Sequence, residues 1–175
     1  MERSGDLIRL KKGLFVVSPE VSNNVLSREL VANHLYGPSY VSLESALSFY
    51  GMIPEKVYAV RSVTPRLSKK YTTSLGNFEY VTVPEDYFQI GIRQEIVDNQ
   101  YAYLIASPEK AICDIIVTTR NLRLQSVKAM QTYIEENLRI DISLYDKYDT
   151  DIIEQCIATG RKNMELTQLL KLLRQ

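Results

Sequence analysis

The chain has no tryptophan, one histidine, two cysteines and seven scattered glycines among its 175 residues, and these shortages exclude several classes of protein. A lone His34 without cysteine neighbours cannot build a zinc site, and no spacing connects it to a nucleophile in a catalytic triad. The glycines form neither of the glycine-rich patterns that bind phosphates, which removes the main support for nucleotide hydrolysis. We therefore expect no catalytic residue, no metal and no cofactor.

Long apolar runs are also missing. We recognise no stretch with the length of a membrane span and no leader peptide. Cys113 and Cys156 lie among apolar residues of predicted helices, so we expect two reduced, buried thiols rather than a disulfide. These features predict a cytoplasmic protein without a membrane partner.

An excess of charge of either sign is absent, because 21 Lys and Arg balance 21 Asp and Glu. The distribution is uneven. Seven acids fall between residues 135 and 154, whereas four cations fall within ten residues without an acid: Arg61, Arg66, Lys69 and Lys70. We expect this basic loop to contact a nucleic acid or an acidic protein surface, with a solvated loop as the alternative. The twelve tyrosines mostly fall at strand positions, where half-buried rings are favoured, so we expect them to pack.

The first half of the chain predicts a small hairpin, two helices and a sheet. Residues 7–17 form two short strands around a Lys-Lys-Gly turn, and Asn23 or Asn24 begins a helix that ends near Tyr36. β-branched and aromatic residues then predict strands at 57–64, 70–73, 78–83, 90–97 and 101–106, with hairpin turns at 74–77 and 98–99. We expect an α+β fold with an antiparallel sheet and helices packed on it.

Helices dominate the second half of the chain. Ser107, Pro108 and Glu109 predict the start of a deeply buried helix, and Ser126 starts another. A helical hairpin follows around Gly160, with Asn163 as the second cap. The terminal stripe of Leu166, Leu169, Leu170 and Leu173 either folds back on the body or binds a partner; we favour folding back, because large exposed apolar patches are unusual.

Residues 35–55 predict a helix with clear start and stop signals. Their sequence is LYGPSYVSLESALSFYGMIPE. Ser42 can accept a hydrogen bond from a free N–H group of the first turn, and Glu44 suits the positive end of the helix dipole. Gly51 provides the left-handed residue that ends the helix. The apolar residues of one face recur at helical spacing and should be buried: Leu43, Ala46, Leu47 and Tyr50.

Carboxylates leave one enzymatic alternative open. A nuclease could use Glu44, Asp86 or Glu95 with Lys110 around a magnesium ion, which needs only two or three oxygen ligands from protein. Helix-start chemistry explains Pro108-Glu109-Lys110 equally well. A metal-dependent nucleic-acid-processing enzyme therefore stays as an alternative, as does an adaptor that binds protein only.

The segment 35–55 resembles the AbiEi family of bacterial antitoxins and transcriptional regulators, which carries a similar Y-V-S-L-E-S-A-L-x-x-Y-G-x-I-P run. The resemblance continues through Arg61-Ser62-Val63-Thr64, Gly76-Asn77-Phe78-Glu79-Tyr80 and Ser107-Pro108-Glu109-Lys110-Ala111. It covers roughly residues 6–120. In that family a winged helix-turn-helix precedes a larger domain.

The resemblance implies that the hairpin is the wing of a winged helix, whose three helices are not in this sequence. Its basic residues would then face operator DNA: Arg3, Arg9, Lys11 and Lys12. The alternative is that edge-strand lysines only discourage aggregation. Without a recognition helix, we expect this chain alone to bind DNA weakly and without sequence preference.

The function implied is that of a non-catalytic regulator: an antitoxin of a type IV toxin–antitoxin pair that represses its own operon and opposes a nucleotidyltransferase-like toxin. The expected organisation is a remnant wing hairpin at 1–19, an α+β antitoxin-like domain at 20–122 and a helical C-terminal segment at 123–175.

Overall fold

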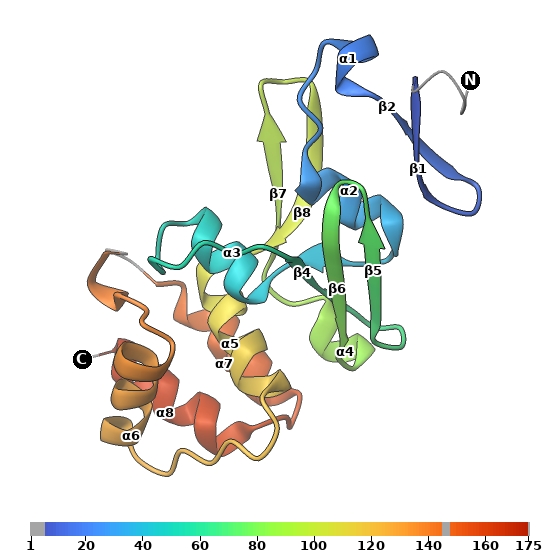
Figure 1. The fold of residues 1–175 in the computed structure, drawn as a ribbon. Coiled ribbons are helices and arrows are strands. Elements are labelled where there is room, and N and C mark those ends of the chain that lie inside the picture. The colour runs from blue at the N-terminus through green and yellow to red at the C-terminus, as the bar shows by residue number, and fades with distance from the viewer. Residues whose placement is uncertain (1–5, 145–147, 175) are drawn as a thin grey trace.

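A computed structural model describes residues 6–144 and 148–174 and shows an α+β fold (Figure 1). The six-stranded sheet has the order β5-β6-β4-β3-β8-β7, and a separate two-stranded sheet holds β1 and β2. No helix within these two ranges is long and apolar enough to cross a bilayer.

The N-terminal hairpin forms as expected. Strands β1 (Leu7–Lys11) and β2 (Leu14–Val17) pair antiparallel, and Gly13 occupies the turn at φ +80°. A short helix, α1 (Pro19–Ser22), follows, and α2 (Arg28–Leu35) packs near the middle of the sheet. The expected cap of α2 is wrong: Ser27 accepts the hydrogen bond from Leu30 N–H, and Asn23 instead ends α1 in a left-handed conformation.

Strand β3 (Tyr40–Val41) leads into α3 (Leu43–Phe49), the helix expected from segment 35–55. Leu43, Ala46 and Leu47 are buried and Gly51 has φ +69° after the last turn, as expected. Tyr50, the fourth residue of the expected face, is only half-buried and follows the last helical residue. The expected cap bond is wrong. The Ser42 side chain makes no bond to the helix, and its Oγ donates to Asp114 Oδ2 at 2.6 Å.

All five predicted strands are present, but the sheet is mixed rather than antiparallel. Strand β6 pairs parallel with β4, and β8 pairs parallel with β3, because in each case a hairpin partner occupies the outer position. Period-2 patterns mark strands without giving their neighbours, so sequence alone could not reveal this order. The strands are β4 (Val60–Thr64), β5 (Lys69–Thr73), β6 (Gly76–Thr82), β7 (Ile92–Val97) and β8 (Tyr101–Ala106).

Both predicted hairpin turns are confirmed. Gly76, the first residue of β6, has φ +115°, and Asp98 and Asn99 have φ +50° and +55° between β7 and β8. Glycine and asparagine tolerate a positive φ, which explains why these turns could be predicted from the sequence. A short helix, α4 (Glu85–Phe88), connects the two hairpins.

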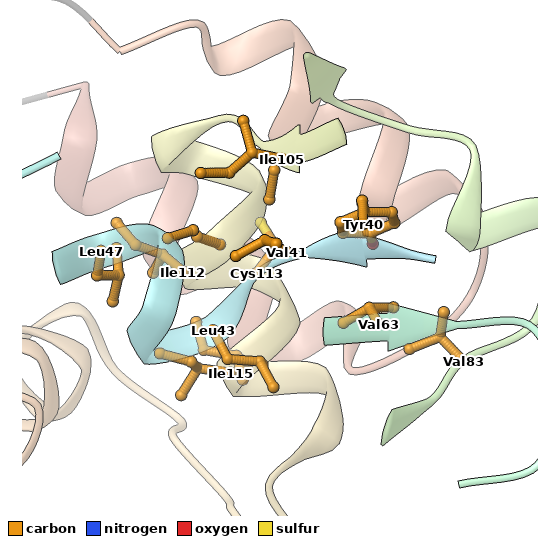
Figure 2. Packing of buried hydrophobic residues seen from close by; sticks show 14 of the residues in the cluster. Tyr40, Val41, Leu43, Leu47, Val63, Val83, Ile105, Ile112, Cys113 and Ile115 are labelled. Atoms are coloured by element: carbon orange, nitrogen blue, oxygen red, sulfur yellow. The ribbon is translucent and has the colours of Figure 1, made fainter. Parts of the chain in front are cut away.

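The central helix α5 (Pro108–Thr118) lies between the sheet with α3 on one side and the C-terminal helices on the other (Figure 1). Ser107 caps it by accepting a hydrogen bond from Lys110 N–H, as expected. Side chains from α5 meet those of β3, β4 and α3 in the core shown in Figure 2. Cys113 and Cys156 are both free and buried.

The C-terminal segment is helical and folds back on α5. Ser126 caps α6 as expected, but Lys162, not Asn163, precedes the last helix. Leu166 and Leu169 are fully buried, so the terminal stripe belongs to the core. The elements are α6 (Val127–Thr132), a π-helical turn η2 (Tyr133–Asn137), a 3₁₀ turn η3 (Ile142–Leu144), α7 (Thr150–Ala158) and α8 (Asn163–Leu173).

Candidate binding surfaces and a buried polar cluster

The basic loop spans the end of β4, the connection and the start of β5. Arg61 Nη1 donates to Glu44 Oε2, and its Nε lies 3.6 Å from Glu79 Oε2. Lys70 Nζ lies 2.8 Å from Glu79 Oε1. The expectation that the loop carries no compensating acid is therefore wrong for these two cations, because Glu44 and Glu79 reach them from α3 and β6.

Arg66 and Lys69 are exposed, and no acid of residues 6–144 or 148–174 forms an ion pair with either. Lys69 Nζ sits 5.0 Å from the centre of the Tyr71 ring and 5.5 Å from that of Tyr36. A cation over two aromatic faces is held in place while its charge stays available to a partner.

Three tyrosines support that lysine. Tyr36, Tyr71 and Tyr80 form a mutually packed group with ring centres 5.2–6.0 Å apart. Tyr80 OH donates to Ala32 O, and burial raises its pKa, so the ring is anchored in the core. Tyr36 OH donates to Leu67 O and so holds the basic connection. We call this region the β5 surface: Tyr36, Arg66, Leu67, Lys69 and Tyr71.

The hairpin cations have different surroundings. Arg3 lies outside the described residues. Lys11 Nζ donates to Leu35 O at 2.6 Å, so its ammonium binds the C-terminal end of α2. Arg9 is exposed on β1, and Lys12 is exposed at the turn. Arg9 and Lys12 are thus the exposed cations of the described part of the hairpin, whereas Lys11 attaches the hairpin to the body.

A groove of about 780 Å³ runs between this hairpin and α2. Apolar side chains from the hairpin and the 24–31 segment form most of its walls, including Leu14, Phe15 and Val25. His34 and Asp98 add polar groups. The single histidine of the sequence therefore lines this groove.

Sequence reasoning missed a buried polar cluster inside the fold, formed by Tyr40, Ser42, Tyr87, Lys110 and Asp114. All five residues are inaccessible to solvent. Lys110 Nζ lies 3.0 Å from Asp114 Oδ1, and Asp114 Oδ2 accepts from Tyr40 OH at 3.0 Å and from Ser42 Oγ. Lys110 Nζ also donates to Tyr87 O at 3.0 Å and lies 3.2 Å from the centre of its ring.

The electrostatics of this cluster keep its phenols neutral. Burial, followed by the neighbouring Asp114 carboxylate, raises the pKa of Tyr40 and that of Tyr87 well above the usual range of tyrosine. The buried charges of Lys110 and Asp114 compensate each other, as buried ions must. The signal in the sequence was a lysine and an aspartate four residues apart on a helix that is otherwise largely apolar after Glu109.

The proposed magnesium ligands do not share a site. Glu44 binds Arg61, Asp86 Oδ1 accepts from Tyr87 N–H, and Glu95 lies on β7. Lys110 is enclosed in the buried cluster. Within the described part of the chain, no three acidic, histidine or cysteine side chains gather in a way that could hold a metal ion. These four residues therefore do not fit the proposed metal centre.

No family model and no curated protein matches the chain.

Proposed function

We propose that this chain is a non-catalytic regulatory protein, an antitoxin of the kind that its sequence resembles, and that it acts by binding through the β5 surface. The observation that carries the proposal is the exposed pair of cations, Arg66 and Lys69, at the edge of a tyrosine cluster. The proposed partners are nucleic acid, including the operator of its own operon, and a nucleotidyltransferase-like toxin.

The chemistry of the surface suits binding to an acidic partner. A lysine held over two rings loses less freedom on binding than a lysine in solvent, so more of its interaction energy remains as affinity. Arginine and lysine bind phosphate oxygens, and exposed tyrosine faces can stack on bases. The same groups also match an acidic protein face.

Two neighbouring ion pairs determine which cations of the basic loop are available to a partner. Glu44 and Glu79 neutralise Arg61 and Lys70, which leaves the positive charge concentrated on the connection before β5. A mutational test should therefore change Arg66 and Lys69 and leave Lys70 in place, because removing Lys70 also leaves Glu79 with one partner fewer.

The test is charge reversal of both exposed cations, Arg66→Glu with Lys69→Glu. We expect protection of a cell that carries the cognate toxin to fail and binding to the operon's own promoter DNA to weaken. Stability should fall by about 1 kcal/mol, because Lys69→Glu removes the cation–π contacts with Tyr36 and Tyr71. The matched control is Lys128→Glu with Lys171→Glu, which makes the same charge change at exposed positions on α6 and α8.

The two readouts identify the partner. Loss of protection with unchanged DNA binding indicates that the toxin or another protein contacts the surface, and loss of both indicates nucleic acid. Full protection and unchanged DNA binding at normal protein level would remove the β5 surface from the proposal.

A further inference from the structure

Strand β7 forms one end of the six-stranded sheet and, within the described residues, pairs with β8 alone. Its pairing with β8 is regular from Ile92 to Val97, without a bulge. It contains neither lysine nor proline. The strand therefore lacks three of the common features that prevent an edge strand from pairing with another chain, namely lysine, proline and a bulge. Its two charged residues, Arg93 and Glu95, have opposite signs.

The opposite edge of the sheet is protected. Strand β5 presents Lys69 and Lys70, both exposed, and lysines on an edge strand discourage pairing. The contrast shows that the two edges of one sheet differ in their capacity to accept a strand.

The outward backbone groups of β7 can be assigned from its neighbour. Ser107 N–H donates to Gly91 O at 2.8 Å, so the backbone of residue 91 points toward the β8 side. Hydrogen-bonding direction alternates along an antiparallel strand, so Arg93 and Glu95 also point toward β8. The amides and carbonyls of Ile92, Gln94 and Ile96 then face away from the sheet, available to a second strand.

The side chains of β7 are complementary to a second copy of themselves. An antiparallel pair with a two-fold axis at Gln94 places Arg93 opposite Glu95 of the other copy, twice, and Ile92 opposite Ile96. The Arg–Glu pairs fall at positions without mutual backbone bonds, where facing side chains approach most closely. An axis at Arg93 or Glu95 would instead place like charges opposite each other.

The face of the hairpin next to this edge is apolar and open. Ile96 is 60% exposed and Leu104 is 42% exposed. Gln94 pairs with Leu104 and Ile96 with Ala102, so these four side chains share one face of the ribbon. Arg93 lies 3.9 Å from the buried Glu109 carboxylate and keeps 45% of its side chain exposed.

We propose that two copies of this chain associate through β7, antiparallel about a two-fold axis at Gln94, and join their sheets into one. The strand contributes six residues, so the interface is small. Small interfaces give weak, reversible association, and we expect a dimer that forms in the micromolar range.

The first test measures association of the full chain by sedimentation over a range of concentrations. The wild type should show a reversible monomer–dimer equilibrium, and Ile96→Lys should stay monomeric at the highest concentration. Met164→Lys is the matched control, because Met164 is also an exposed large apolar residue and lies on α8. It should dimerise like the wild type. A wild type that stays monomeric, or an Ile96→Lys variant that dimerises equally well, would overturn the proposal.

The second test checks the register. Facing residues of a hydrogen-bonded antiparallel pair have Cα atoms about 5.5 Å apart, which suits a disulfide. Under a thiol oxidant such as diamide, Gln94→Cys should give a covalent dimer, whereas Thr72→Cys on the exposed part of β5 should not. The native thiols are buried and do not compete. Equal crosslinking of both variants, or none for Gln94→Cys, would contradict the two-fold axis at Gln94.

Discussion

Asp114 shows how much of this fold depends on single polar residues inside the core. Its carboxylate accepts hydrogen bonds from Tyr40 and Ser42 and forms an ion pair with Lys110. These partners come from two different segments of the chain. Removing one partner of a buried charge costs more than an ordinary hydrogen bond, because the remaining charge stays desolvated. Ser42 belongs to this group rather than to the helix that it precedes.

The buried phenols predict a loss of stability in alkali. The pKa of Tyr40 and of Tyr87 is raised in the folded protein, chiefly by burial, whereas tyrosine in an unfolded chain has a pKa of about 10. Their contribution is complete below about pH 10 and is lost as the pH rises further, since only the unfolded chain releases the proton. Urea unfolding of the wild type should show this decline, and Tyr40→Phe should show a shallower one. Tyr58→Phe, at an exposed position, should match the wild type.

At the scale of elements, α3 combines regular and strained features. Leu43 begins the helix at φ +55°, a left-handed conformation that costs a leucine about 1–2 kcal/mol. Its side chain is 1% exposed, and the preceding Ser42 is bonded to Asp114, so tertiary contacts hold the strained residue in place. Apolar spacing predicted the helix and its buried face, but it carries no information about the left-handed conformation of Leu43.

The inner face of α3 should dominate its contribution to stability. Leu47 is fully buried, so Leu47→Ala should lower the free energy of unfolding by about 2–5 kcal/mol through lost burial and a cavity. Leu67→Ala makes the same chemical change at an exposed position and should cost less than about 0.5 kcal/mol. Denaturant unfolding of both variants measures the difference. Equal losses would show that α3 is not a core element.

At the scale of the whole molecule, local sequence signals predicted most helices and strands. They did not predict the strand order or the contacts between distant residues. A turn, a helix cap or an apolar face depends on residues that are close in sequence. The hairpins and the buried helix α5 could therefore be predicted from the sequence. The insertion of β3 between β4 and β8, and the convergence of Glu44 and Glu79 on Arg61, depend on residues far apart in sequence. No periodic pattern records such contacts.

The shortness of β3 has a consequence for the order of folding. This two-residue strand joins the two halves of the sheet, and Val41 pairs with Ile105 across a long stretch of chain. The hairpins β5–β6 and β7–β8 close short loops, whereas the β3–β8 contact must close a long one, and the entropic cost of closure grows with loop length. We expect both hairpins to form before the junction between them.

Stopped-flow kinetics can check this order. Val41→Ala should speed unfolding more than it slows folding, because its contacts form late, whereas Tyr71→Ala in the β5–β6 hairpin should slow folding. A Val41→Ala variant whose whole effect falls on the folding rate would place the junction in the nucleus. In the expected order, the core polar cluster closes last, since Tyr40 reaches Asp114 only when β3 is seated between its neighbours.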